Sequence, residues 1–247
     1  MSVAARDPRL RALRRVLARH APRRAPRGAE TLEAGVSLVL RPGAADLELL
    51  LIERVERPGD PWSGHMALPG GMRERTDADL RATAFRETAE EVGVALDDER
   101  LLGALDEVAP SSPRLPPLVI SPWVAAVAPG TPLVPDPAEV ATALWVPLAE
   151  LRGEGAVSEV LVELEGSHRS FPSLRYLDYQ IWGLTYRILR QFMALTREVW
   201  EAEAGKAEVG EGEAGDIEAG DDEARGTEAR ETETRQGPGG ATAADER

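Results

Sequence analysis

Three glutamates stand close together in residues 86–94, which read RETAEEVGV. On a helix, positions three or four apart lie on one face, so Glu87 and Glu91 are one turn apart with Glu90 beside them. Carboxylates at this density repel one another unless a cation lies between them, and such hard oxygen ligands suit Mg²⁺ or Mn²⁺. The alternative interpretation is a solvated acidic face on an ordinary amphipathic helix.

The residues before the glutamates favour the metal site. Gly70 and Gly71 allow a sharp turn and a close approach of the backbone, so a main-chain carbonyl of Gly70 could complete a metal shell. Arg86 lies one turn before Glu90, and its planar guanidinium could hold a neighbouring carboxylate in place. Asp77 precedes the helix and could serve as its N-cap.

The stretch from Pro69 to Val94 resembles the Nudix box, G-x5-E-x7-R-E-U-x-E-E-x-G-U with U a bulky apolar residue. This motif belongs to hydrolases that cut diphosphates linked to another moiety. The resemblance implies an α/β/α sandwich with a mixed sheet. It also implies that Glu87, Glu90 and Glu91 bind catalytic divalent metals. Metals on a diphosphate neutralise its charge and activate a water for attack at phosphorus, and the resemblance implies that Arg86 orients these glutamates.

Two departures from the general pattern concern the first half of the motif. Arg86 lies 15 positions after Gly71, one more than the general pattern has, and Asp77 stands where that pattern has a glutamate. Both features are similar to the coenzyme A pyrophosphatase branch of the family. The flanking stretches agree with that branch over roughly residues 32–198, although Leu68 replaces a phenylalanine before the Pro-Gly-Gly. This resemblance implies cleavage of coenzyme A or acyl-CoA to 3′,5′-ADP and 4′-phosphopantetheine or its acyl derivative.

Four residues upstream of the Gly-Gly turn are candidates for binding substrate. Arg54 and Arg57 match the branch's upstream signature, but a second downstream arginine is absent, and its loss would weaken binding of a 3′-phosphorylated nucleotide. His65 could contact a substrate phosphate or serve as a structural histidine. Trp62 could stack on an adenine ring or cover the edge of the core. The substrate is therefore less firmly predicted than the reaction class.

One downstream acid completes the candidate catalytic set of Glu90, Arg86 and Glu139. Glu139 occupies a position similar to that of an acid which binds metal or acts as the base in some Nudix enzymes; the alternative is a plain surface glutamate. Asp106 and Glu107 are weaker candidates for the same role.

The elements that must position these residues read as an α+β protein. Helices are expected over residues 7–19, about 78–92 and 181–200, the second with Ala82, Phe85, Ala89 and Val92 on its core face. Strands are expected at residues 35–41, 47–54, 65–71, 101–109, 118–128 and 141–148, with a hairpin formed by residues 158–166 and 168–179. Trp123, Trp145 and Trp182 are expected in the core. Strands with few intervening helices favour a mixed sandwich.

Charge divides the chain into three parts. Residues 1–30 are predicted to form a basic helix and linker, since positions 1–28 hold nine arginines and one acid. Residues 31–200 are the predicted Nudix hydrolase domain. Residues 201–247 hold 15 acids and five bases and almost no large apolar side chains, so they are predicted to be a disordered acidic tail.

Composition excludes several classes of function. A net charge of −14 argues against general binding of nucleic acid. There is no cysteine for thiolate metal sites, no apolar run of membrane-spanning length and no secretory signal, so a cytoplasmic protein without a membrane partner is expected. The expected partner is a small nucleotide, and the expected assembly a monomer or homodimer. Hydrolysis of another nucleoside diphosphate derivative such as ADP-ribose is the first alternative, and a non-catalytic Nudix-fold binding module is the second.

Overall fold

The computed structural model describes residues 3–57, 64–110, 117–164 and 167–202. Except for its first two residues, the predicted acidic tail lies outside this part of the chain. The described residues form ten strands and five helices longer than a single 3₁₀ turn, followed by helical residues 197–202. None of these helices has the length and apolar character needed to cross a membrane.

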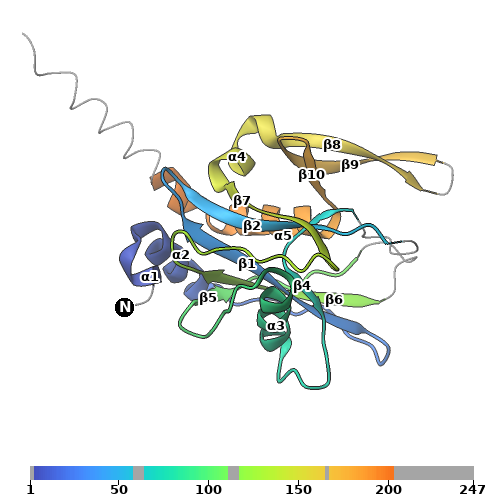
Figure 1. Cartoon of the computed structure of the whole chain (residues 1–247), viewed down its shortest axis with the longest axis horizontal. Coiled ribbons are helices and arrows are strands. Elements are labelled where there is room, and N and C mark those ends of the chain that lie inside the picture. The colour runs from blue at the N-terminus through green and yellow to red at the C-terminus, as the bar shows by residue number, and fades with distance from the viewer. Residues whose placement is uncertain (1–2, 58–63, 111–116, 165–166, 203–247) are drawn as a thin grey trace, which may run out of the picture. The chain divides into compact units, whose positions relative to one another are not determined.

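A mixed sheet of seven strands is the centre of the fold (Figure 1). Its main path runs β3-β2-β1-β6-β5, with β4 also paired to β1 and β7 to β2. β1 and β6 are parallel, from Leu32 beside Leu118 to Leu40 beside Ala126, and the other pairs are antiparallel. The strands are β1 (Leu32–Pro42), β2 (Leu47–Arg54), β3 (Met66–Ala67), β4 (Gly70–Met72), β5 (Leu101–Ala104), β6 (Leu118–Ala126) and β7 (Val140–Pro147).

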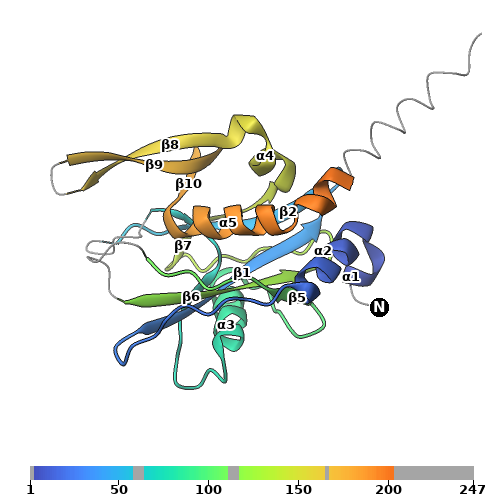
Figure 2. The ribbon, with the colours of Figure 1, turned by 180° about the vertical axis from the view of Figure 1, so that it is seen from behind.

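Helices cover both faces of this sheet, as Figures 1 and 2 show from opposite sides. On one face, α3 (Leu80–Val92) packs with Val39, Leu50 and Ile52. On the other face, α2 (Pro8–Arg19) and α5 (Gly183–Leu195) enclose the larger part of the core. Strands buried on both faces read as continuous apolar runs, as residues 49–52 of β2 do. The predicted α+β class and α/β/α sandwich with a mixed sheet are confirmed.

Helix α3 lies unusually close to β1. A Cβ at Gly35 would be 2.1 Å from the carbonyl oxygen of Leu80, so only glycine fits there. The hydroxyl of Ser37 donates to the carbonyl of Ala84 at 3.1 Å. This spacing admits only small side chains between helix and strand. The predicted core face of the helix was therefore wrong in part: Val92 is buried as expected, but Ala89 is exposed and Phe85 half-buried. The buried residues are Leu80, Thr83, Ala84, Thr88, Glu91 and Val92.

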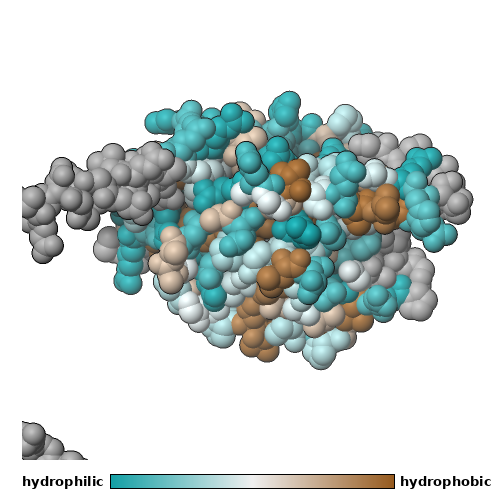
Figure 3. All heavy atoms as spheres, turned by 90° about the horizontal axis from the view of Figure 1, so that it is seen from above, coloured by the Kyte–Doolittle hydropathy of each residue, from teal (hydrophilic) through white to brown (hydrophobic). Residues whose placement is uncertain are grey.

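A second, three-stranded antiparallel sheet of order β10-β9-β8 follows (Figure 1). Its strands are β8 (Val157–Leu164), β9 (Ser167–Tyr176) and β10 (Tyr179–Trp182), reached from β7 through α4 (Leu148–Arg152) and a 3₁₀ turn (Glu154–Ala156). The predicted hairpin of β8 and β9 is confirmed. When the molecule is seen from above relative to Figure 1, apolar residues form small separate groups among hydrophilic ones (Figure 3).

The predicted long helix over residues 181–200 was wrong at its start and is interrupted at Thr196, while residues 197–200 are helical as predicted. Its first two residues belong to β10, where Ile181 pairs with Leu174 of β9. Gly183 then turns the chain into α5 with a φ of +64°, a left-handed conformation that favours glycine. At the other end, α5 stops before Thr196, whose hydroxyl accepts a hydrogen bond from the indole N–H of Trp200 at 2.9 Å.

The basic N-terminal segment is held on the sheet by carboxylates. After the short α1 (Val3–Arg6), α2 buries Leu10, Leu13 and Leu17 and begins at the N-cap Asp7. Residues 21–28, expected as a linker, are fastened by ion pairs. Arg23 lies 2.6 Å from Asp106, and Arg27 lies 2.7 Å from Glu107.

Candidate active site

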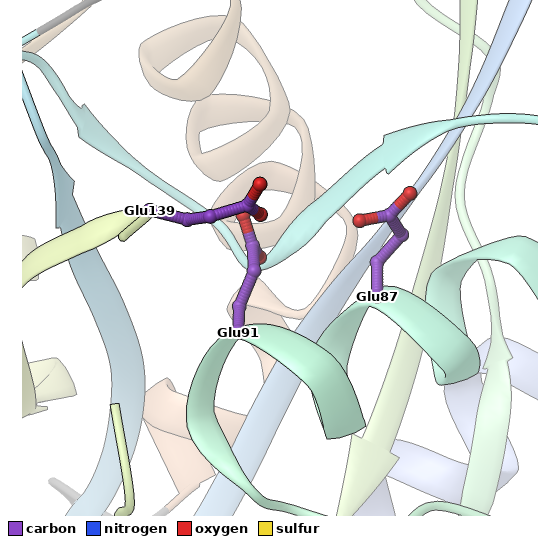
Figure 4. A group of neighbouring side chains, drawn as sticks. All are labelled: Glu87, Glu91 and Glu139. Carbon is purple, nitrogen blue, oxygen red and sulfur yellow. The ribbon is translucent and has the colours of Figure 1, made fainter. Parts of the chain in front are cut away.

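Three carboxylates converge above the C-terminal half of α3. Glu87 and Glu91 come from the helix, and Glu139 comes from the turn just before β7. One oxygen from each lies within 4.8 Å of the others. Figure 4 shows the side chains of Glu91 and Glu139 meeting, with that of Glu87 beside them. Two parts of the chain nearly fifty positions apart therefore share one acidic cluster.

Glu91 is the buried member of this cluster, with 2% of its surface exposed. One of its oxygens accepts a hydrogen bond from the backbone N–H of Gly70 at 2.8 Å. Burial raises the pKa of Glu91 to about 8, against the opposing effects of the Gly70 N–H and the nearby positive charge of Arg54, while Glu87 and Glu139 add repulsion. A carboxylate in this position is destabilised when ionised, unless a cation is added.

The Gly-Gly turn makes room for the first carboxylate. A Cβ at Gly71 would lie 2.5 Å from the carboxyl carbon of Glu87, so the side chain of Glu87 rests directly on the glycine backbone. At Gly70 the φ of +152° and the carbonyl oxygen of Gly35, 2.4 Å from a Cβ, exclude other residues as well. Burial raises the pKa of Glu87, although the charge of Arg86 opposes the shift.

The guanidinium of Arg86 is held in place by the carboxylate of Asp77. Its Nε and Nη2 atoms donate to the two oxygens of Asp77, each at 3.1 Å. The carboxylate of Asp77 also accepts from the hydroxyl of Thr83 at 2.9 Å. The hydrogen bonds from Arg86 lower the pKa of Asp77 to about 2 despite burial. The prediction that Asp77 caps the helix was wrong, because Asp79 is the N-cap and accepts from the N–H of Ala82 at 2.8 Å.

Arg86 links Asp77 to two of the predicted metal ligands. Its guanidinium lies 3.0 Å from Glu87 and 2.7 Å from Glu90. Glu90 is exposed, and it does not belong to the cluster formed by Glu87, Glu91 and Glu139. The structure thus brings together two of the three helical glutamates and Glu139, and places Glu90 against Arg86.

The turn that carries Glu139 is docked on the end of α3. The N–H of Asp136 donates to the carbonyl of Glu91 at 2.9 Å, and the N–H of Val55 donates to the carbonyl of Glu139 at 3.0 Å. Arg57 lies 3.6 Å from the Glu139 carboxylate. Asp106 and Glu107, the weaker candidates, lie elsewhere: they bind the arginines of residues 21–28.

The predicted substrate residues lie at the ends of β2 and β3. The N–H of Arg54 donates to the carbonyl of His65 at 3.2 Å, so these residues are opposite one another. The His65 ring meets the edge of Trp182 at a centroid distance of 4.7 Å. Trp62 lies outside the described residues. Trp123, Trp145 and Trp182 are half-buried rather than enclosed in the core, and Trp145 packs against the core cluster that contains Val39 and Leu50. In the sequence, the only sign that Trp182 lies beside a turn is the glycine that follows it.

The donor set fits a hard divalent cation. Three carboxylates that approach within 4.8 Å, one of them buried and with a raised pKa, combine the oxygen chemistry and charge that Mg²⁺ or Mn²⁺ takes in proteins. Arg86 stands at the rim of this cluster and limits how far Glu87 can move. Chemically, the arrangement can hold a cation beside a bound polyanion and orient an attacking water.

Comparison with known proteins identifies the family. The NUDIX domain model matches residues 31–164, which is more than half of the chain. The chain therefore belongs to the NUDIX domain family. A crystal structure of a MutT/nudix family protein from Enterococcus faecalis is similar with a TM-score of 0.50, at 22% identity, and covers 70% of this chain and 65% of that one. That likeness supports the fold.

Two relatives place the chain more closely. An uncharacterized Nudix hydrolase, NudL, from Photorhabdus laumondii is 33% identical over 142 residues, 58% of this chain and 74% of that protein. An uncharacterized protein of Schizosaccharomyces pombe is 45% identical over 107 residues, 42% of this chain. The matched part spans only 32% of the Schizosaccharomyces pombe protein. The predicted membership among Nudix hydrolases is confirmed at the level of the family.

Proposed function

We propose that this chain is a metal-dependent pyrophosphatase that cleaves the diphosphate of coenzyme A or acyl-CoA. The products would be 3′,5′-ADP and 4′-phosphopantetheine or its acyl derivative. The observation that carries the proposal is the cluster of Glu87, Glu91 and Glu139, with Arg86 held at its rim. A non-catalytic module is the weaker alternative, because a buried ionisable glutamate such as Glu91 costs stability and needs a compensating function.

The metal would be held by the carboxylates of Glu87, Glu90 and Glu91 and by the carbonyl of Gly70. Bound Mg²⁺ or Mn²⁺ would neutralise the diphosphate and lower the pKa of a water. The Gly70 N–H keeps Glu91 in one orientation, since it donates to that carboxylate at 2.8 Å. Glu90 is exposed and 2.7 Å from Arg86, so it can turn toward substrate-bound metal when the substrate displaces this ion pair.

Proton transfer is assigned to Glu139. Glu139 lies within 4.8 Å of Glu87 and Glu91, and it reaches the cluster from the opposite side of the site. Its exposed carboxylate can accept a proton from the attacking water, while Arg86 holds Glu87 and Glu90 out of that path. General bases of this kind typically contribute about 10²- to 10⁴-fold to the rate.

The substrate side of the proposal is carried by two arginines. Arg54 is close enough to Glu91 to lower its pKa, and Arg57 lies 3.6 Å from Glu139. Guanidinium groups bordering the carboxylates would bind the outer oxygens of a diphosphate. The spacing between Asp77 and Arg86 resembles that of the coenzyme A pyrophosphatase branch, and this supports coenzyme A as the substrate. The missing second arginine of the upstream signature is the specific observation that keeps ADP-ribose as the alternative substrate.

One panel tests the proposal. The full-length protein is incubated with coenzyme A, acetyl-CoA, ADP-ribose and dinucleoside polyphosphates, with Mg²⁺ or Mn²⁺ and with EDTA, and the products are separated by chromatography. We expect kcat/KM to be highest for coenzyme A or acetyl-CoA and activity to disappear in EDTA. Equal or faster turnover of ADP-ribose would overturn the coenzyme A assignment but keep the reaction class.

A pair of variants tests the site itself. Glu91→Gln keeps an acceptor for the Gly70 N–H but removes the charge from the cluster, and it should lose at least about 100-fold in kcat. Glu150→Gln, an exposed residue of α4, is the matched control and should retain full activity. Full activity of Glu91→Gln would contradict the metal-site assignment. A cytoplasmic location and a monomeric or homodimeric state remain predictions.

A further inference from the structure

A row of side chains leads from the carboxylate cluster to the second sheet. It begins at Glu139, whose backbone carbonyl accepts a hydrogen bond from the N–H of Val55, the neighbour of Arg54, at 3.0 Å. Arg54 lies opposite His65 across the β2–β3 pair, where their backbones are hydrogen-bonded at 3.2 Å. The His65 ring contacts Trp182 of β10. The row therefore joins the site to a residue that neither the Nudix motif nor the substrate-binding signature includes.

The indole ring of Trp182 contacts two other rings. His65 meets it at 4.7 Å and 66° between ring planes, and Phe171 of β9 lies at 5.6 Å and 42°. All three side chains are half-buried, so the group is a fixed but accessible aromatic surface. Next to it, a Cβ built on Gly183 would meet no atom within 4 Å, which shows open space beside the strand end.

We propose that Trp182 is the stacking surface for the planar base of the nucleotide substrate. This inference rests on the proposed function and deepens it. In a nucleoside diphosphate derivative, a single ribose separates the base from the diphosphate. With the diphosphate at Arg54 and the carboxylates, the base reaches outward along the row toward His65 and Trp182. A ring with fixed neighbours loses little conformational entropy when a base stacks on it.

The 4′-phosphopantetheine end of the substrate is the alternative occupant of this aromatic surface. A flexible apolar or amide-containing arm is stabilised by enclosure on several sides, whereas a planar base gains most of its contact from one flat ring. Trp182, His65 and Phe171 offer ring surfaces to an occupant. The chemistry of these three side chains therefore favours the base.

Product binding separates the two occupants without catalysis. AMP, ribose 5-phosphate and 4′-phosphopantetheine are titrated into the full-length protein with Mg²⁺ by calorimetry. The variants are Trp182→Leu, which keeps an apolar side chain against His65 and Phe171, and Trp182→Phe, which keeps a flat ring. Trp123→Phe on β6 is the control, because Trp123 is also half-buried but lies in the other sheet.

We expect Trp182→Leu to weaken AMP binding about tenfold or more and to leave ribose 5-phosphate binding unchanged. Trp182→Phe should retain most of the affinity, and Trp123→Phe all of it. Unchanged AMP binding, an equal loss for AMP and ribose 5-phosphate, or a loss for 4′-phosphopantetheine alone would each overturn the proposal. If Trp182→Leu does not fold, Trp182→Phe and His65→Ala carry the comparison: a loss of AMP binding in His65→Ala with ribose 5-phosphate unaffected supports it, and no loss overturns it.

The proposed function and this inference fail separately. AMP binding requires no hydrolysis, so a negative result in the substrate panel leaves this test intact. Conversely, hydrolysis of coenzyme A that is insensitive to Trp182, together with AMP binding that is insensitive to Trp182, would remove the inference and leave the proposed function in place.

Discussion

Both carboxylate oxygens of Asp77 accept hydrogen bonds from the guanidinium of Arg86, at 3.1 Å each. Only 8% of the surface of Asp77 is exposed. Arg86 in turn lies 3.0 Å from Glu87. The acid before the helix is therefore connected to the carboxylate cluster through one arginine. It acts as a positioning residue, and the extra position between Asp77 and Arg86 leaves Asp79 free to cap the helix.

Asp77→Asn should loosen Arg86 and destabilise the fold. Charge-assisted hydrogen bonds are lost on a nearly buried residue, so we expect the free energy of unfolding to fall by about 2 kcal/mol, measured by urea denaturation. The rate should fall about tenfold with little change in KM. Asp79→Asn is the control: asparagine caps helices as well as aspartate, so stability and rate should stay near wild type. Equal effects of the two variants would contradict the positioning role.

Gly71→Ala should disable the site while sparing the fold. The added Cβ would lie 2.5 Å from the carboxyl carbon of Glu87, so this side chain must move off the backbone. We expect the Mg²⁺ concentration needed for half-maximal activity to rise about 10- to 100-fold, as for other residues that support metal ligands. In Gly155→Ala the new methyl group meets nothing within 4 Å, and this variant should behave as wild type. An unchanged Mg²⁺ dependence in Gly71→Ala would refute the prediction.

Local periodicity was enough to predict much of the fold. The apolar runs at residues 35–41 and 47–54 are strands, and the spacing of Glu87 and Glu91 placed both on one side of a helix. These features depend on neighbours along the chain, where strand and helix repeats are visible in sequence.

The predictions that were wrong concern positions whose structure depends on contacts between residues far apart in the sequence. Phe85 looked like a core residue on a helical wheel, but the closeness of α3 to Gly35 on β1 leaves space only for small residues. Ile181 continued an apolar helical pattern, but pairing with Leu174 on β9 makes it a strand residue. The role of Asp77 was missed because its partner Arg86 lies nine positions further along the chain, about two helical turns beyond the cap Asp79. Glu139 was suggested only by resemblance, and the docking of its turn on α3 explains why it reaches the cluster.

The variant Glu139→Gln should show whether Glu139 acts as the general base or as a metal ligand. If Glu139 takes the proton of the attacking water, kcat should fall about 100-fold while the Mg²⁺ dependence remains near that of wild type. Glu159→Gln, an exposed residue of β8, is the control and should match wild type. A large shift in Mg²⁺ dependence would instead make Glu139 a metal ligand.

The buried Glu91 predicts a stability that falls with rising pH in the metal-free protein. Its pKa is about 8 in the folded state, above its usual value of 4.5, so the folded protein holds this proton more tightly than the unfolded chain. The resulting stabilisation is fully present below pH 4.5 and is lost as the pH rises through 8. In EDTA, the Tm should therefore decrease between pH 6 and 8.5, and Glu91→Gln should remove part of that decrease.

Added Mg²⁺ should act in the opposite direction on the same group. A bound cation stabilises the ionised carboxylate, so at pH 8.5 the Tm of the wild type should rise with Mg²⁺ concentration, as expected for a ligand that binds only the folded state. Glu91→Gln should show a much smaller rise, and Glu150→Gln a normal one. If wild type and Glu91→Gln gave the same pH slope in EDTA and the same response to Mg²⁺, Glu91 would be a structural residue outside the metal site.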